Sequence, residues 1–405
     1  MNSPVLTRVL WVRGLRAFAD GYVSLLLPIY LMELGMSTVQ VGAITTATLI
    51  GSGLLTLLAG FQAYRFACRT LLLTAALLMA ATGFGFAAIA SFWPLLLVAF
   101  VGTLNPSSGD VSVFLPLEHA VLSRVVKDRQ RTAAFARYSL VGALVAAAGA
   151  LAAGLPDVMS SVIRIDTKVA LQAMFALYGV IGLLSAAIYA TLPQKGETAE
   201  TESARKAERV PLKESRKIVY TLAALFSLDA FGGGFVVQSM LALWLFQKFQ
   251  LSTAVAGTIF FWAGLFSAVS YLVAVRIADR FGLVNTMVFT HLPANILLIL
   301  IPFMPTLGWA IALLLARSLL SQMDVPTRSS YVMAIVSPAE RAAAASITTV
   351  PRSLASAAGP LLAGYLLSIS AFGWPLVIAG GLKILYDVLL LRMFRTVRPP
   401  EEGRA

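Results

Sequence analysis

Several charged residues lie inside long apolar segments of this sequence. In the segment near residues 8–33 they are Arg16 and Asp20, and in the segment near residues 217–246 the carboxylate is Asp229. A charge at the centre of a membrane helix costs about 2.5–3.5 kcal/mol on insertion scales, so such residues are expected to face partners or a cavity. A carboxylate that is removed from water binds a proton more readily, as a proton carrier must. Asp229 and Asp20 are therefore candidate proton-binding groups, and Glu118, in the segment near residues 93–124, is a third.

Both carboxylates also have a structural interpretation. Asp20 follows Arg16 by four residues, a spacing that places the two side chains on one helix face and allows a permanent ion pair. Asp229 has no basic residue within its own helical turns, which makes it the better candidate for proton binding. Its competing role is that of a structural partner for Arg16.

Two blocks of the sequence are homologous. Residues 115–154 and 325–364 align without a gap, and twelve of forty positions are identical, including a proline, an arginine and two glycines in register. A second pair of blocks agrees, in which residues 17–23 correspond to residues 230–236. Homologous halves in one apolar chain are typical of transporters, whose binding site lies where the repeats meet.

Equivalent positions of the two halves carry opposite charges. Glu118 aligns with Arg328, and Arg16 aligns with Asp229. These two swaps suggest that the charges pair across a pseudo-two-fold axis between the halves. The alternative is that each charge pairs within its own half, or that the long side chains reach the membrane interface.

The composition is that of an integral membrane protein. Hydrophobic residues make up 59% of the chain and charged residues 12%, whereas soluble domains carry about 25% charged residues. A helix of about 20 apolar residues spans the hydrocarbon core. Twelve segments meet this requirement, near residues 8–33, 38–63, 70–90, 93–124, 133–155, 170–191, 217–246, 253–278, 284–303, 306–332, 343–369 and 373–394.

The distribution of basic residues predicts the topology. Lysine and arginine gather in the loops after even-numbered spans and in the C-terminal tail, so both termini are expected in the cytoplasm. The predicted domains are an N-terminal six-helix bundle (1–193), a polar cytoplasmic linker (194–216), a C-terminal six-helix bundle (217–396) and a cytoplasmic tail (397–405). The net charge of +12 is explained by these loops and not by a nucleic-acid partner.

The predicted architecture has twelve spans in two halves, cytoplasmic ends and a long central loop. A local sequence motif after span 8 adds to this evidence. There a small residue is followed by Asp279 and Arg280 and then, two positions later, by Gly282. The matching loop after span 2 has Tyr64 where the Asp is expected. In these respects the chain resembles the major facilitator superfamily. The resemblance implies an all-α membrane fold of twelve helices in two homologous bundles around a central cavity, with alternating access. It also implies that spans 4 and 10 approach at the inner mouth, where Glu118 and Arg328 would form a gate pair.

The resemblance extends to a motif in span 11. Ala358–Gly364 is similar to the Gly-Pro motif that drug/proton antiporters carry in span 5, although the equivalent segment of span 5 here has no proline. We therefore expect proton-coupled efflux of a small organic solute. The alternative is uptake or exchange of an organic anion, because Arg16, Arg328 and Arg352 could hold a carboxylate or phosphate.

Polar residues interrupt span 4, which holds eight more residues than its counterpart in the second half. Proline and glycine within a span break the helix, and the freed backbone groups can bind a ligand. The alternative is a kinked helix that binds nothing. Together with polar residues of spans 7 and 10, the candidate cavity residues are Asn105, Ser107, Ser108, Asp110, Gln238, Gln322 and Asp324.

Two further embedded groups are expected to be structural. Lys383 and Asp387 have the spacing of a self-neutralising pair on span 12, and His119 is expected to pack rather than to relay protons. With one cysteine and two histidines in the chain, neither a metal cluster nor a disulfide framework is expected, and no cofactor is implied.

Other classes of function lack their sequence features. There is no Walker A loop for ATP, and no nucleophile, base or metal set for an intramembrane enzyme. A receptor with this fold would bind a solute without moving it. The expected partners are a small solute, protons and the lipid bilayer, and the expected form is a monomer in a bacterial inner membrane.

Overall fold

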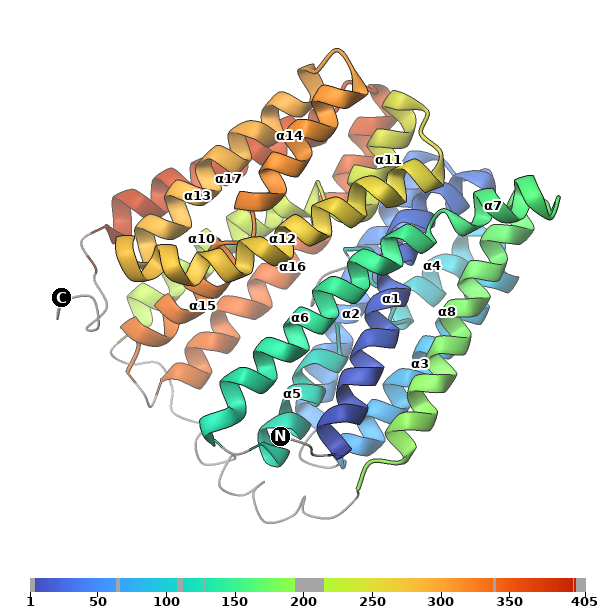
Figure 1. Ribbon diagram of the computed structural model, residues 1–405. Helices are drawn as coiled ribbons and strands as arrows, with labels where there is room; N and C mark the ends of the chain where they lie inside the picture. Colours follow the sequence, from blue (N-terminus) through green and yellow to red (C-terminus); the bar gives the residue numbers. More distant parts are fainter. Residues whose placement is uncertain are drawn as a thin grey trace. The chain divides into compact units, whose positions relative to one another are not determined.

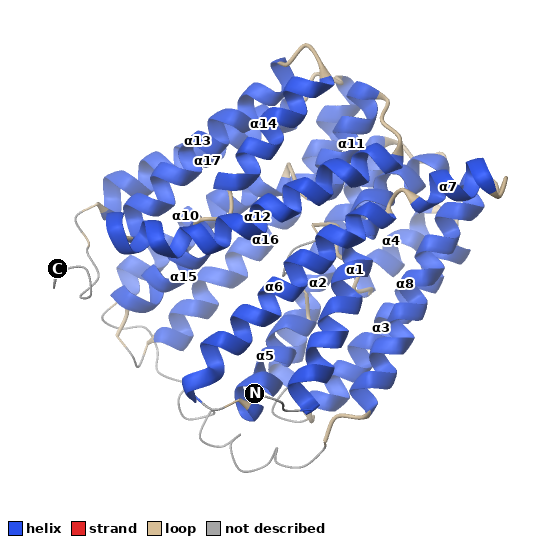
Figure 2. Cartoon of the chain, in the orientation of Figure 1, coloured by secondary structure: helices blue, strands red, loops and turns tan. Residues whose placement is uncertain are grey.

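The computed structural model describes residues 4–62, 66–107, 112–126, 128–193, 215–337, 340–395 and 397. These residues form helices joined by short connections, with no strand among them (Figure 1, Figure 2). Among the described helices, nine are long and apolar enough to cross a membrane. The predicted all-α membrane fold is confirmed.

The helices follow the predicted spans closely. In the first half of the chain they are α1 (Pro4–Glu33), α2 (Thr38–Gln62), α3 (Cys68–Ala88), α4 (Phe92–Val101), α5 (Phe114–Val125), α6 (Asp128–Ala152), α7 (Leu155–Val162) and α8 (Thr167–Ala190). In the second half they are α10 (Arg216–Gly234), α11 (Gln238–Phe249), α12 (Thr253–Phe281), α13 (Leu283–Leu300), the 3-10 turn η1 (Ile301–Phe303), α14 (Leu307–Leu320), α15 (Asp324–Ile335), α16 (Arg341–Ile369) and α17 (Trp374–Phe394). The short helix α7 lies between the predicted spans at residues 133–155 and 170–191.

Spans 4, 7 and 10 are each broken into two helices, α4 and α5, α10 and α11, and α14 and α15. The repeated prolines explain two of the breaks. Pro116 is the third residue of α5 and Pro326 the third residue of α15. Proline is tolerated in the first turn of a helix, where its missing N–H is not needed, but not in the interior. Each proline therefore marks where a new helix starts.

The chain forms two compact units. The first consists of Met1–Glu197 with Val237–Gly264, and in it α1 packs along α6 and α8, while α11 packs against α1. The second consists of Thr198–Val236 with Leu265–Ala405, and in it α10 packs along α16 and α17. The predicted domain boundaries stay a prediction, and most of the predicted linker (residues 194–214) lies outside the described residues.

Glycines at equivalent repeat positions allow helices to approach closely within each unit. In the first unit, a Cβ on Gly21 of α1 would meet the backbone of Ala146 in α6, and a Cβ on Gly149 would meet the backbone of Phe18. In the second unit, Gly234 of α10 and Gly359 of α16 approach each other in the same way. The internal repeat is thus also a repeat of helix packing.

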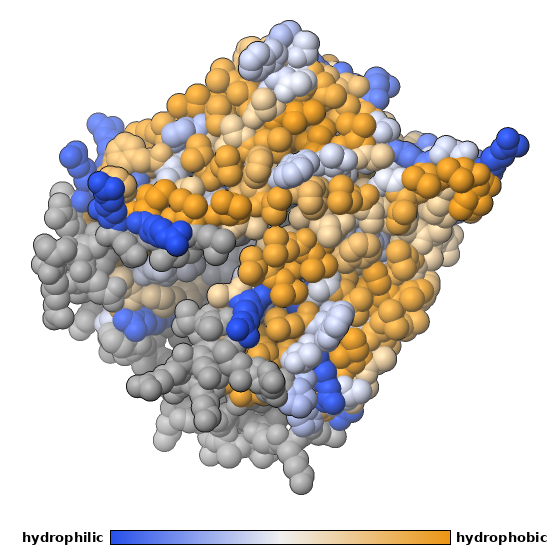
Figure 3. Space-filling view, viewed as in Figure 1, coloured by the Kyte–Doolittle hydropathy of each residue, from blue (hydrophilic) through white to orange (hydrophobic). Residues whose placement is uncertain are grey.

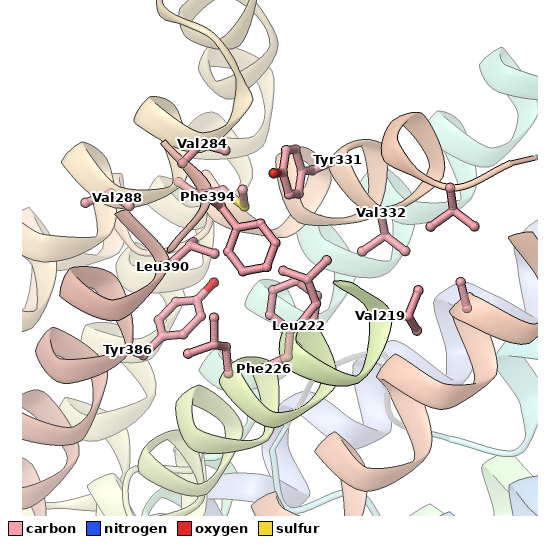
Figure 4. Close-up of a cluster of buried hydrophobic side chains, with 14 residues drawn as sticks. Val219, Leu222, Phe226, Val284, Val288, Tyr331, Val332, Tyr386, Leu390 and Phe394 are labelled. Atoms are coloured by element: carbon pink, nitrogen blue, oxygen red, sulfur yellow. The ribbon is translucent and has the colours of Figure 1, made fainter. Parts of the chain in front are cut away.

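Hydrophobic side chains cover most of the visible surface of the helices (Figure 3), as a lipid-facing surface requires. The core of the second unit draws buried side chains from α10, α13, α15 and α17, among them Phe226, Tyr331, Tyr386 and Phe394 (Figure 4). The rings of Phe226 and Tyr386 in this core also contact the buried guanidinium of Arg328.

Candidate functional site

The core of the first unit holds an ion pair between Arg16 of α1 and Glu118 of α5. Their side chains are 2% and 0% exposed. The hydroxyl of Tyr138 also donates to Glu118, and the hydroxyl of Tyr189 donates to Oε1 of Glu118 at 2.6 Å. A buried charge is tolerated when it is both paired and hydrogen-bonded. Three donors from three helices therefore explain how a carboxylate lies in this core.

Aromatic rings line this ion pair. The guanidinium of Arg16 lies 4.0 Å from the ring centroid of Phe114, and that of Arg13 lies 4.9 Å from the ring of Tyr138. Each contact is worth about 0.5–2 kcal/mol. Asp20 is buried one turn further along α1, and its possible roles in proton binding and in pairing with Arg16 stay predictions.

The core of the second unit holds a larger charged cluster centred on Asp229 of α10. Its carboxylate accepts from Arg328 of α15 at 2.9 Å and from Lys383 of α17 at 2.7 Å. Arg328 also pairs with Asp324, one turn earlier in α15, and two aromatic rings of the hydrophobic core lie over its guanidinium. Asp229 is thus a buried carboxylate with two cations from two other helices.

The two units contain the same helix-to-helix ion pair with the charges reversed. Arg16 and Glu118 pair in the first unit, and Asp229 and Arg328, at the equivalent repeat positions, pair in the second. The oppositely charged residues thus form ion pairs within each unit. This is the alternative that was given above to pairing between the halves. The gate pair of Glu118 with Arg328 stays a prediction.

The expected pair within span 12 is wrong. Lys383 reaches Asp229 on α10, and Asp387 instead accepts from Asn295 of α13 and lies 2.9 Å from Nδ1 of His291. Helix α17 packs along both α10 and α13, so partners on neighbouring helices are closer than the partner one turn away. His291 and Asn295 were not predicted from the sequence. Their spacing of four residues places them on one face of a helix, but it does not show which helix packs against that face.

Comparison with known proteins identifies the fold. The sequence profile described as the Major Facilitator Superfamily matches residues 9–319 and 224–405. The chain belongs to the Major Facilitator Superfamily. An uncharacterized membrane protein of Saccharomyces cerevisiae is 24% identical to it over 96% of this chain and 93% of the yeast protein.

Solved transporters of the superfamily share the fold. The nucleoside transporter NupG matches with a TM-score of 0.73 at 14% identity, covering 97% of this chain and all of NupG. A bacterial homolog of the human lysosomal transporter Spinster matches with a TM-score of 0.73 at 16% identity, covering 98% of this chain and 97% of that protein. The xylose transporter XylE from E. coli matches with a TM-score of 0.72 at 15% identity, covering 99% and 98%.

Membership of the superfamily establishes the general class of function. The chain is a multi-pass membrane transporter for a small molecule, and it is not an enzyme. The solved transporters of this fold are named for chemically different solutes. The choice of solute therefore depends on the residues of each protein and not on the superfamily fold.

The break in span 4 brings polar groups into a buried position. Between α4 and α5, Asn105 is 2% exposed, and its side-chain oxygen accepts from the backbone N–H and the hydroxyl of Ser107 at 3.1 and 2.8 Å. The backbone N–H of Ser239, in the first turn of α11, donates to the carbonyl of Pro106 at 3.1 Å. Broken helices of this kind line binding sites in other transporter folds. Ser108 and Asp110 lie outside the described residues.

The other candidate residues lie at helix ends or within helices. Gln238 begins α11, Gln322 lies in the break between α14 and α15, and Arg352 lies within α16. In the loop motif, Arg280 is exposed and Gly282 has a φ of +82°, a conformation that glycine adopts without strain. Asp279 is in the last turn of α12, and its side chain is outside the described part of the structure. The part of these residues in transport stays a prediction.

Proposed function

We propose that this chain is a proton-coupled antiporter that exports a small organic solute, with Asp229 as the group whose protonation drives the cycle. The observation that carries the proposal is the pairing of Asp229 with both Arg328 and Lys383 inside the membrane-spanning part of the chain. An ionised carboxylate holds two cations by charge. Protonation removes that charge, so the side chains of α15 and α17 are released from α10. Proton binding is thereby converted into movement of helices.

Glu118 and Asp20 are the other proton-binding candidates. Glu118 is held by one cation and by two tyrosine hydroxyls. The hydroxyls can remain hydrogen-bonded to a protonated carboxyl group. Protonation of Glu118 would therefore change fewer contacts than protonation of Asp229, which supports Asp229 as the switch.

The remaining parts of the proposal come from the sequence. Efflux is supported by the similarity of Ala358–Gly364, with Pro360 inside α16, to the antiporter motif. Cytoplasmic termini are supported by the positions of the basic loops. A bacterial inner membrane and a monomeric form belong to the same proposal. The cavity residues and the gate pair of Glu118 with Arg328 belong to the same proposal.

Replacing Asp229 by asparagine is expected to abolish solute-triggered proton movement, because an amide holds the same volume but binds no proton at neutral pH. The measurement uses proteoliposomes with an internal pH dye, to which pooled organic cations, anions and neutral compounds are added. Exchange of a labelled solute is measured in parallel, since an uncoupled but folded variant retains it.

The matched control is Glu33→Gln, an exposed carboxylate at the end of α1, which is expected to behave as the unsubstituted protein. A protein that exchanges labelled solute with no pH change in any pool would be a uniporter or a solute exchanger. Proton coupling would then be rejected.

One observation favours transport of an organic anion as a second candidate. Arg16 and Arg328 are each neutralised by carboxylates of their own unit, whereas Arg352 of α16 makes no ion pair within the described part of the chain. A half-buried arginine with no carboxylate at ion-pair distance among the described residues is suited to bind a carboxylate or phosphate group of a solute.

Replacing Arg352 by glutamine is expected to raise the KM for an anionic solute by about 10- to 100-fold. This corresponds to the loss of a charged hydrogen bond worth about 1.5–3 kcal/mol. A cationic or neutral solute is expected to retain its KM. The KM values are measured by uptake of labelled solutes into proteoliposomes. The control is Arg8→Gln, a half-buried arginine in the second turn of α1 that donates to a backbone carbonyl. An unchanged KM for every anion would remove Arg352 from the binding site.

A further inference from the structure

His291 of α13 lies between two buried carboxylates from two other helices. Its Nδ1 is 2.9 Å from Oδ1 of Asp387 in α17, and its Nε2 is 3.8 Å from Oδ1 of Asp229 in α10. Asn295, one turn further along α13, donates to the second oxygen of Asp387 at 3.0 Å. The side chain of His291 is 5% exposed. Both ring nitrogens therefore face carboxylates away from bulk solvent.

We propose that His291 is a proton relay that receives the coupling proton and passes it to Asp229, while Asp387 and Asn295 hold its ring in position. This inference rests on the proposed function, because it names the group that delivers the proton to Asp229. It also assigns a role to α13 and α17, whose polar residues would otherwise be costly within a membrane.

Nδ1 of His291 lies within hydrogen-bond distance of Oδ1 of Asp387, at 2.9 Å, and of the amide nitrogen of Asn295, at 3.1 Å, whereas Nε2 lies 3.8 Å from Asp229. We assign the proton of the neutral ring to Nδ1, because the carboxylate of Asp387 is the closer acceptor. The lone pair of Nε2 then faces Asp229. A proton from the aqueous phase binds to Nε2 and forms an imidazolium between two carboxylates. The ring must then close the 3.8 Å separation between Nε2 and Oδ1 of Asp229. The proton moves across the hydrogen bond so formed, which leaves a neutral ring and a neutral carboxyl group.

Lys383 competes with His291 for the same oxygen atom. Oδ1 of Asp229 accepts from Nζ of Lys383 at 2.7 Å and lies 3.8 Å from Nε2 of His291. Protonation at this oxygen weakens the hold on Lys383. The arrival of a proton through His291 is thus coupled to release of α17 from α10.

Other charged groups around the relay shape its behaviour. Arg328 and Asp324 of α15 act through Asp229, and Arg317 of α14 and Arg352 of α16 also interact electrostatically with Asp229. The Tyr386 ring packs edge-on against His291, with centroids 6.1 Å apart. The cations stabilise the ionised form of Asp229, so its protonation requires the release of Arg328 and Lys383.

The alternative is that His291 and Asp387 only fasten α13 to α17. The two interpretations differ in one measurable property, since a relay must gain and lose a proton and a structural hydrogen bond need not. The chain has two histidines, and the other, His119, packs against the rings of Phe135 and Tyr138 in the first unit. The variant His119→Phe retains a ring at that position and leaves a single histidine to observe.

The first experiment follows the ring nitrogens of 15N-histidine-labelled H119F protein in lipid nanodiscs by NMR over about pH 5–9, the range in which histidines commonly titrate. We expect His291 to change between the neutral and the doubly protonated ring, and we expect Asp387→Asn to displace that change. A ring that stays in one protonation state throughout would overturn the inference.

The second experiment uses the proteoliposome assay with the pH dye. His291→Gln is expected to lose solute-triggered proton movement and to retain exchange of labelled solute, whereas His119→Phe retains both. Full proton movement in His291→Gln would overturn the relay and leave the proposed function intact. Absence of proton movement in the unsubstituted protein would overturn the proposed function, and the NMR experiment would still test proton binding by His291.

Discussion

Replacing Glu118 by glutamine is expected to lower the free energy of unfolding by about 3–5 kcal/mol, because it leaves a buried arginine without its counter-charge. The side chain of Glu118 is fully buried, and it accepts from Arg16, Tyr138 and Tyr189. A neutral amide presents one acceptor oxygen and adds an NH₂ donor that faces other donors. Thermal unfolding of the purified protein in detergent measures the loss.

A double-mutant cycle separates this pair from general damage to the core. Arg16→Met destabilises alone, but in combination with Glu118→Gln it removes the uncompensated charge, so the double variant is expected to be more stable than additivity predicts. The second unit suggests a further test, because Arg16→Asp with Glu118→Arg reproduces the polarity of Asp229 and Arg328. A Glu118→Gln protein that unfolds at the original temperature would show that the pair contributes nothing to the fold.

Replacing Gly359 by valine is expected to prevent normal packing of α16 against α10. A Cβ at position 359 would lie 2.5 Å from Cα of Gly234 and 2.5 Å from the backbone nitrogen of Phe235. Backbone atoms cannot turn aside as a flexible side chain can, so the helices must separate. Overpacking usually costs about 1–3 kcal/mol, and we expect at least that loss here, together with a fall in the yield of monodisperse protein.

The matched control is Gly381→Ala in α17, where an added Cβ would meet nothing within 4 Å. Alanine favours the helix by about 1 kcal/mol relative to glycine, so this variant is expected to be as stable as the original protein or slightly more stable. Equal unfolding temperatures for the Gly359 and Gly381 variants would contradict the close approach of α10 and α16.

The fold class could be predicted from the sequence because its causes are local. Apolar segments of about 20 residues must be helical in a membrane, where each backbone group needs a partner within its own segment. The repeated prolines, Pro116 and Pro326, mark the starts of α5 and α15 for an equally local reason, the lack of an N–H group. The same repeat showed that the charges of equivalent positions are opposite.

The partners of those charges could not be predicted in this way. Helical spacing suggested that Lys383 pairs with Asp387, whereas in the folded chain Lys383 reaches Asp229 on α10 and Asp387 lies against His291 on α13. A spacing of four residues makes contact possible on an isolated helix. In a packed bundle, a side chain on a neighbouring helix can approach more closely and with better hydrogen-bond geometry.

The sequence alone thus determined the membrane fold, the internal repeat and the identity of most embedded charges, since these follow from local composition and spacing. Only the tertiary structure showed that Arg16 pairs with Glu118, and Asp229 with Arg328, each within its own unit. It also showed that His291 lies beside the second pair. The physical reason is that a buried charge must be neutralised at a distance of a few ångströms. That distance is set by which helices pack together, and residues far apart in the chain meet there.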